Sequence, residues 1–245
     1  MKVGRDPLHQ YMTRSEAEVA QYDTGLRQYM LSIYNYMASA LALTGLIAYV
    51  TATYSMSNPA VAELLFVSPL KWVVMLAPIG LVFFLAARIH AMSALTAQAV
   101  FWIYASLMGL SLASIFLIFT GQSIARVFFI TAGAFAGVSL YGYTTKRDLS
   151  GFGSFLFMGM IGIILASIVN VFLASSALQF AISVIGVLVF TGLTAYDTQR
   201  IKELYDELDA SDVMGKKAIM GALTLYLDFI NLFIMMLQLF GNKNE

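Results

Sequence analysis

The sequence of 245 residues contains no cysteine, only four prolines and few charged residues, which make up 11% of the chain. The absence of cysteine excludes disulfides, thiolate metal sites and a cysteine nucleophile. The 14 basic and 14 acidic residues balance to a formal net charge of zero, so nothing favours nucleic acid, whose binding is typically marked by a basic surface. Residues 1–28 are mixed polar and lack a short apolar core, so we expect no cleavable signal peptide.

Hydrophobic residues are abundant instead, at 60% of the chain, which is more than one soluble domain of this size can bury. A helix needs about 20 predominantly apolar residues to cross a bilayer, and seven stretches reach that length. They lie at residues 29–54, 70–91, 97–120, 124–144, 151–174, 177–199 and 217–240. We therefore predict an all-α integral membrane protein, with a seven-transmembrane-helix bundle at 29–240, an N-terminal tail at 1–28 and a C-terminal tail at 241–245.

The basic residues are distributed unevenly between the two sides of this predicted bundle. Lysine and arginine accumulate on the cytoplasmic side of membrane proteins. Of the 14, eleven lie in the N-terminal tail or in the second, fourth and sixth connections, and the other three are Lys71, Arg126 and Lys243. We therefore expect the N-terminus in the cytoplasm and the C-terminus on the opposite side.

Small residues recur within the spans, among them Gly133 and Gly137 in the fourth and Gly151, Gly153, Gly159 and Gly162 in the fifth. Faces of small residues let helices approach closely in lipid. Because a bundle of seven helices has ample internal surface, we expect these glycines to pack inside it rather than between two copies of the chain.

Only two of the 14 acidic residues, Asp197 and Asp228, fall inside the predicted spans. A carboxylate in hydrocarbon costs roughly 2.5 to 3.5 kcal/mol on insertion scales, so it usually faces the bundle interior and has a partner. Two carboxylates brought together cannot both ionise cheaply, and we expect this pair to share a proton and titrate as a unit. For Asp197, near Arg200, the alternative is a separate carboxylate that reaches the interface.

Other polar side chains lie one helical turn from these aspartates. Thr194 precedes Asp197, and Thr224 and Asn231 share the helical face of Asp228. These groups offer oxygen atoms to a proton, a water molecule or a cation.

The predicted span ends make a meeting of the two aspartates difficult. At 1.5 Å per residue, Asp228 lies roughly 17 Å along its helix from Lys217, whereas Asp197 lies about 5 Å from Arg200. The two can meet only if the sixth helix continues past Arg200 or the seventh begins in the cytoplasm.

Arg88 is a third candidate, at the cytoplasmic end of the second span. Its guanidinium can hold a carboxylate bidentately, and such a contact would depend on the protonation of that carboxylate. The alternative is an anchor on the positive side of the membrane. The acidic segment at 203–212 lacks the spacing and central glycine of an EF-hand, and we interpret it as a solvated amphipathic extension.

At these residues the chain resembles the transmembrane Bax inhibitor motif family. The resemblance covers all seven spans, and the segments that carry it are Ala87-Arg88-Ile89, residues 192–199 (GLTAYDTQ) and residues 225–233 (LYLDFINLF). It implies a central seventh helix and a pH-sensitive calcium leak, gated by a hydrogen-bonded pair of Asp197 and Asp228 with Arg88 as a latch. The second span here contains no acidic residue, so a cation route using a carboxylate at that place is not expected.

The resemblance also implies ligands, partners and a location. Calcium would be the transported ion, bound weakly and transiently by Asp197 and Asp228, and no cofactor is expected. Besides the bilayer, calcium and protons, a membrane-bound protease is a candidate partner. We expect a multi-pass protein of the bacterial inner membrane.

Two other functions stay open. One is a regulatory membrane protein that binds a membrane protease or another complex without conducting ions. The other is an intramembrane aspartyl protease, which also uses two aspartates on consecutive spans, the first preceded by tyrosine as in Tyr196-Asp197. Such proteases have Gly-x-Gly-Asp at the second aspartate, where this chain has Leu225-Tyr226-Leu227-Asp228. We therefore expect no enzymatic activity and no catalytic residues.

Overall fold

The computed structural model describes the backbone of residues 7–244 and the side chains of residues 21–244. Within that range the chain is helical and has no β-strand beyond one isolated bridge. The long helices are α1 (Pro7–Ser57), α3 (Leu70–Arg88), α4 (Ala94–Ile118), α5 (Gly121–Thr144), α6 (Ser150–Leu173), α7 (Ser176–Glu203) and α8 (Ser211–Phe240). Short helical turns, α2 (Pro59–Ala62), Glu63–Val67 and Ile89–Ala91, lie between α1 and α4.

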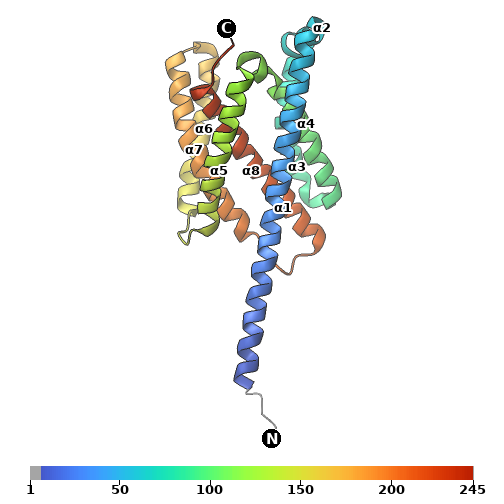
Figure 1. Ribbon diagram of the computed structural model, residues 1–245, viewed down its shortest axis with the longest axis vertical. Helices are drawn as coiled ribbons and strands as arrows, with labels where there is room; N and C mark the ends of the chain where they lie inside the picture. Colours follow the sequence, from blue (N-terminus) through green and yellow to red (C-terminus); the bar gives the residue numbers. More distant parts are fainter. Residues whose placement is uncertain (1–6, 245) are drawn as a thin grey trace.

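Seven of the described helices are long and apolar enough to cross a membrane. This confirms the predicted seven-helix fold, although several helices are longer than the apolar stretches. Helix α1 begins at Pro7, inside the segment expected to be a tail, and projects beyond the bundle (Figure 1). Proline suits the first position of a helix because the amide hydrogen that it lacks would have no partner there.

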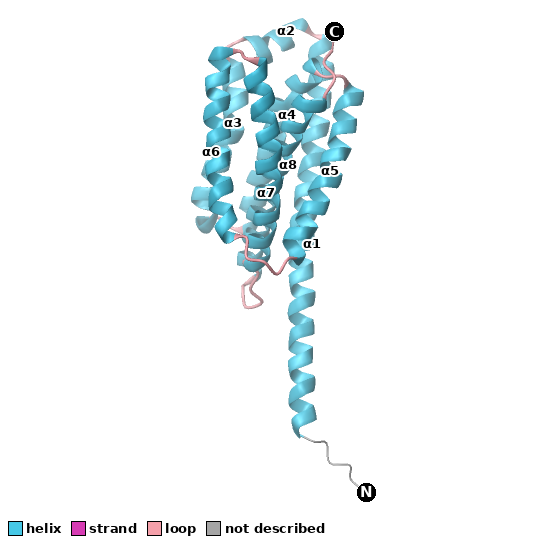
Figure 2. Cartoon of the chain, turned by 90° about the vertical axis from the view of Figure 1, so that its left-hand side faces the viewer, coloured by secondary structure: helices cyan, strands magenta, loops and turns pink. Residues whose placement is uncertain are grey.

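Helix α8 lies at the centre of the bundle (Figure 2). In its most apolar window 61% of the residues are buried, against 17% for α3 and for α6. It packs against α1, α4, α5 and α7. The Tyr226 hydroxyl, fully buried on α8, is hydrogen-bonded to that of Thr44 on α1 at 2.8 Å. This agrees with the central seventh helix that the family resemblance implies.

The two ends of the bundle differ in their connections. The N-terminus lies at the same end as the connections α3–α4, α5–α6 and α7–α8, here called the N-terminal end, and the C-terminus lies at the other (Figure 1). The connections at the N-terminal end are those that contain most of the basic residues in the sequence. That this end faces the cytoplasm stays a prediction.

The packing expected of the small residues is confirmed for Gly153 and Gly159 of α6, where an added Cβ atom would meet Tyr196 and Val189 of α7. It was wrong for Gly151 and Gly162 of α6 and for Gly133 and Gly137 of α5, which are exposed and where an added Cβ atom would meet nothing within 4 Å. The close approach occurs farther along the same helix, at Gly142, where a Cβ atom would run into the backbone of Ala195 on α7. The α5–α7 contact therefore depends on a glycine outside the small-residue spacing.

Candidate functional site

Asp197 and Asp228 meet between the neighbouring helices α7 and α8. Their carboxyl groups lie close enough to interact with each other, and the buried Oδ2 of Asp228 has no other hydrogen-bond partner. A hydrogen bond between the two carboxyls would require a proton on at least one of them, because an ionised carboxylate only accepts. Asp228 is 5% exposed, and Asp197 is partly buried. The geometric difficulty is resolved at both ends, because α7 continues past Arg200 to Glu203 and α8 begins at Ser211.

The carboxyl pair faces a cavity of about 780 Å³ between α3, α6, α7 and α8. Thr224 and Asn231 line the same cavity, as their spacing from Asp228 predicted. Thr224 donates its hydroxyl hydrogen to the carbonyl of Met220 at 3.1 Å, and Asn231 donates its amide to that of Leu227 at 2.9 Å. Because both donate to their own helix, their side-chain oxygen atoms keep acceptor capacity.

A second cavity, of about 480 Å³, leads to the pair from the N-terminal end. We call it the vestibule. It shares Asp197, Arg200 and Thr224 with the first cavity. Asp197 thus lies where a vestibule at the end of the bundle meets a cavity inside it, and Asp228 lines the inner cavity alone.

Two lysines of the vestibule wall have their charges matched locally. Lys216 forms an ion pair with Asp212 at 2.9 Å, and Lys217 forms one with Asp209 at 2.6 Å. Asp209 and Asp212, in the acidic segment around the α7–α8 connection, are therefore used in ion pairs. The charged residues that line both cavities are Asp197 and Arg200, which lie three residues apart on α7.

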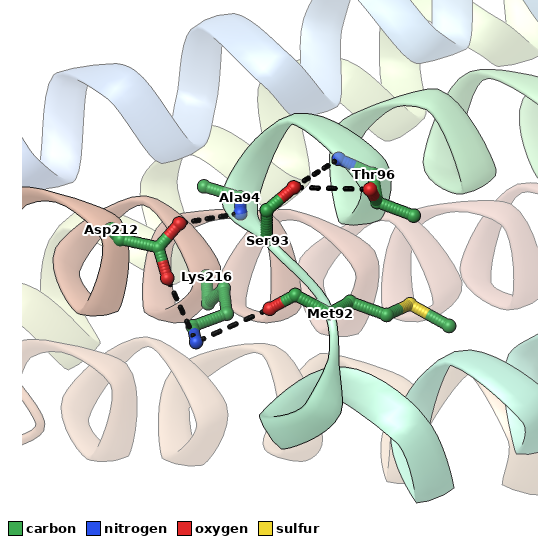
Figure 3. A network of polar contacts seen from close by, with 6 residues as sticks. All are labelled: Met92, Ser93, Ala94, Thr96, Asp212 and Lys216. Atoms are coloured by element: carbon green, nitrogen blue, oxygen red, sulfur yellow. Dashed lines mark hydrogen bonds and ion pairs between the residues drawn. The ribbon is translucent and has the colours of Figure 1, made fainter.

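The Asp212–Lys216 pair also fixes the α3–α4 connection to α8 (Figure 3). Asp212 accepts a hydrogen bond from the backbone amide of Ala94 at 2.7 Å, and Lys216 donates to the carbonyl of Met92 at 3.3 Å. Ser93 caps the start of α4 by accepting from the amide of Thr96. The vestibule wall is thus tied to the segment that follows Arg88.

Arg88 itself is not brought to the carboxyl pair. It is exposed at the last residue of α3, and across residues 21–244 no ion pair or hydrogen bond joins it to Asp197 or Asp228. The positive charge that acts on Asp197 is that of Arg200, three residues along the same helix. The sequence already indicated this interaction, because Arg200 follows Asp197 by three residues.

Thr194 lines neither the vestibule nor the cavity that contains the carboxyl pair. It is fully buried, and its hydroxyl donates to the carbonyl of Phe190 at 2.8 Å. The chain also forms a polar connection that sequence reasoning missed, in which Tyr34 is hydrogen-bonded to Ser139 at 2.6 Å and Ser139 to Thr198 at 2.8 Å. These residues are remote in sequence, so no local pattern could have linked α1, α5 and α7.

The oxygen atoms at the pair form only part of a calcium shell. Calcium prefers six to eight oxygen ligands, whereas the cavity offers two carboxyl groups with Thr224 and Asn231. Among the described residues no group of three or more His, Asp or Glu side chains is placed to hold a metal ion. Such a donor set suits brief contact with a passing ion better than a resident metal.

A seven-helix bundle with a carboxyl pair inside its spans defines a class, that of multi-pass integral membrane proteins with an intramembrane acidic site. The family model described as "Inhibitor of apoptosis-promoting Bax1" matches residues 26–245, and the chain belongs to that family. The resemblance seen at residues 87–89, 192–199 and 225–233 is thereby confirmed.

Bacterial relatives cover nearly the whole chain. The "Inner membrane protein YbhL" of Escherichia coli is 49% identical over 228 residues, which are 92% of this chain and 96% of the relative. An uncharacterized protein of Rickettsia prowazekii is 49% identical over 224 residues, 91% and 93% of the two chains. An uncharacterized membrane protein of Streptococcus pyogenes is 34% identical over 226 residues, 91% and 96%. These names and the seven helices agree with the expected multi-pass protein of a bacterial inner membrane.

Proposed function

We propose that the protein is a slow calcium leak of the bacterial inner membrane, regulated by protonation of the carboxyl pair. The observation that carries this proposal is the position of the pair in the intramembrane cavity, with Asp197 at the junction of that cavity and the vestibule. An ionisable group inside a membrane span that faces a cavity is typical of ion and proton pathways. Because Lys216 and Lys217 are paired with aspartates, they oppose entry of a cation less than two free lysines would.

The proposed gate is the position of α3 relative to α7 and α8. In this structure α3 packs against α4, and the cavity separates it from the carboxyl pair. In the closed state α3 would move toward the pair, and Arg88 would hold an ionised carboxylate. A neutral carboxyl binds arginine more weakly than a carboxylate does, so protonation would release α3 and open the path. The structure, with Arg88 away from the pair, supports the released state.

The alternative is regulation of a membrane protease or another complex without conduction, in which case the aspartate pair would have a structural role. The projecting part of α1 favours this alternative, because it offers a helix outside the bundle to a partner (Figure 2). We propose neither an enzymatic activity nor a cofactor.

Calcium flux into liposomes that contain only this protein tests the proposal, with pH varied from about 8 to about 5. We expect the flux to rise on acidification. Asp228→Asn should bring the ratio of acid to neutral flux close to one, and Arg88→Ala should raise the flux at neutral pH. Asp148→Asn, which removes an exposed carboxylate of the α5–α6 connection, should leave the profile unchanged.

Two outcomes would contradict the leak. Flux equal to that of empty liposomes at every pH would favour the regulatory alternative. An unchanged pH profile in both Asp228→Asn and Arg88→Ala, at matched protein density, would place the titrating group elsewhere.

A further inference from the structure

A second hollow lies on the other side of α8, between α1 and α5. Helix α1 packs against α4 and α8, and α5 packs against α7 and α8. The space between α1 and α5 forms a cavity of about 850 Å³, with Phe229 of α8 in its lining. A smaller cavity of about 330 Å³ continues it and shares Leu41, Ala42, Phe128 and Phe229 with it. We call the two together the α1–α5 groove.

The groove is as long as the membrane is thick. On α1 its lining runs from Arg27 to Ala48, and on α5 it runs in the opposite direction from Tyr143 to Gly121. The 21 residue steps on α1 correspond to about 32 Å at 1.5 Å per residue, close to the hydrocarbon thickness of about 30 Å. Its rim is open, because Leu31, Leu46 and Phe129 are 50%, 61% and 73% exposed. In a membrane such an opening faces acyl chains.

Apart from Thr44, the polar and charged groups of the groove lie at one end. Along most of its length the lining is alanine, leucine, methionine and phenylalanine, but Arg27, Tyr34, Ser139 and Tyr143 line the N-terminal end. Lys202 of α7 lies at the same place. Its amine donates to the carbonyl of Tyr143 at 2.9 Å and stands 5.1 Å from the centre of the Tyr143 ring.

The charge at this end suits an anion. Arg27 is exposed, and among residues 21–244 no ion pair neutralises either Arg27 or Lys202. The acidic residue nearest along α1 is Asp23, one turn farther from the groove. Because the groove is about as long as the hydrocarbon is thick, a lipid phosphate would lie at the level where the groove ends. Basic pockets between transmembrane helices are known to bind anionic head groups.

We propose that the α1–α5 groove binds one anionic phospholipid, with an acyl chain between α1 and α5 and the phosphate between Arg27 and Lys202. A second protein chain would cover the apolar length of the groove but would not use the cations at its end. The bound chain also contacts Tyr34 and Ser139, the first two members of the polar connection to Thr198. Thr198 follows Asp197 directly, so the lipid supports the helix that carries one member of the carboxyl pair.

Native mass spectrometry of the full-length protein, exchanged into detergent with phosphatidylglycerol or phosphatidylcholine, tests this site. The wild type should retain one phosphatidylglycerol in preference to phosphatidylcholine. Arg27→Gln and Lys202→Gln should each weaken retention of phosphatidylglycerol about fivefold, as expected for one cation near a lipid head group. Lys146→Gln, which removes an exposed charge from the same end of the bundle, should have no effect.

A second variant tests the acyl chain independently of the charge. Ala136 lines the groove and is exposed, so Ala136→Phe should fill the groove and abolish retention of either lipid while the protein stays folded. Equal retention of both lipids by the wild type, or unchanged retention in Arg27→Gln and Lys202→Gln, would overturn the proposal. The proposal would also be overturned if the protein formed a lipid-free dimer that Ala136→Phe dissociates, because a second copy of the chain would then occupy the groove. None of these readouts depends on calcium flux.

Discussion

The two hollows beside α8 are similar in size and differ in the polar groups that they contain. The cavity toward α3 and α6 has a volume of about 780 Å³ and contains the carboxyl pair, whereas the cavity between α1 and α5 has about 850 Å³ and is apolar over most of its length. Consecutive residues of α8 face different cavities: Asp228 lines the cavity toward α3 and α6, and Phe229 lines the cavity between α1 and α5. Neighbouring residues of a helix point about 100° apart, so one central helix separates a hollow that contains two carboxyl groups from one that contains none.

This difference shows which hollow can carry an ion. An ion in the apolar groove would lose its water without gaining ligands, whereas the carboxyl side offers oxygen atoms and a vestibule. The groove instead matches the chemistry of lipid.

The largest effect on stability is expected on the face of α5 that packs against α7, not on the face that lines the groove. Gly142→Ala should destabilise the protein by about 1 to 3 kcal/mol or more, because the added methyl group would collide with the Ala195 backbone. Gly133→Ala on the same helix meets open space and should be neutral or stabilising by up to about 1 kcal/mol. Thermal unfolding in detergent measures both, and equal losses would mean that α5 is packed alike on both sides.

The two hollows should also differ in their access to water. The chain has no cysteine, so Thr224→Cys in the vestibule and Ala136→Cys in the groove each give a single thiol. A charged thiol reagent added at the N-terminal end should label Thr224→Cys roughly tenfold faster, because thiolates form poorly in apolar surroundings.

A lipophilic maleimide serves as the control and should label both cysteine variants. Equal labelling rates of the two cysteine variants with the charged reagent would contradict the expected difference in water access between the two hollows. Labelling of Thr224→Cys only from outside the cell would reverse the predicted orientation.

The smallest effect concerns a carboxylate outside both hollows. The pKa of Asp148 lies below its ordinary 3.8, because the side chain and the backbone amide of Ser150 hydrogen-bond to it. A lowered folded-state pKa means that its stabilising effect is present above the ordinary pKa and lost as pH falls through the lowered value. Asp148→Ala should lower Tm by no more than about 2 °C at neutral pH, and this difference should vanish in strong acid. A difference that grew on acidification would contradict the assignment.

Much of the fold and part of the site could be predicted from sequence. The seven spans followed from hydrophobicity, because the length of an apolar stretch is set by the thickness of the bilayer. The two aspartates stood out because acidic residues are rare inside spans, and their meeting needed only longer helices than the apolar stretches indicated. The helices extend into polar sequence because backbone hydrogen bonding does not end where hydrophobicity does.

The features that could not be predicted from the sequence depend on how the helices pack against one another. Gly133 and Gly137 have a spacing typical of helix contacts, but α5 turns Gly142 to α7 instead. Arg88 ends α3, and whether it reaches the pair depends on where α3 stands, which spacing along the chain does not determine. The α1–α5 groove arises because both helices pack on α8 and leave space between them, an arrangement without a signal in either helix alone.

Calcium flux against pH for the wild type, Asp197→Asn, Asp228→Asn and the double variant tests most directly whether the two carboxyls act as one unit. Residues that titrate together give non-additive effects. The account predicts that each single variant loses the rise on acidification and that the double variant loses nothing more. Two single variants that each keep part of the rise, with losses that add up in the double variant, would contradict the shared proton.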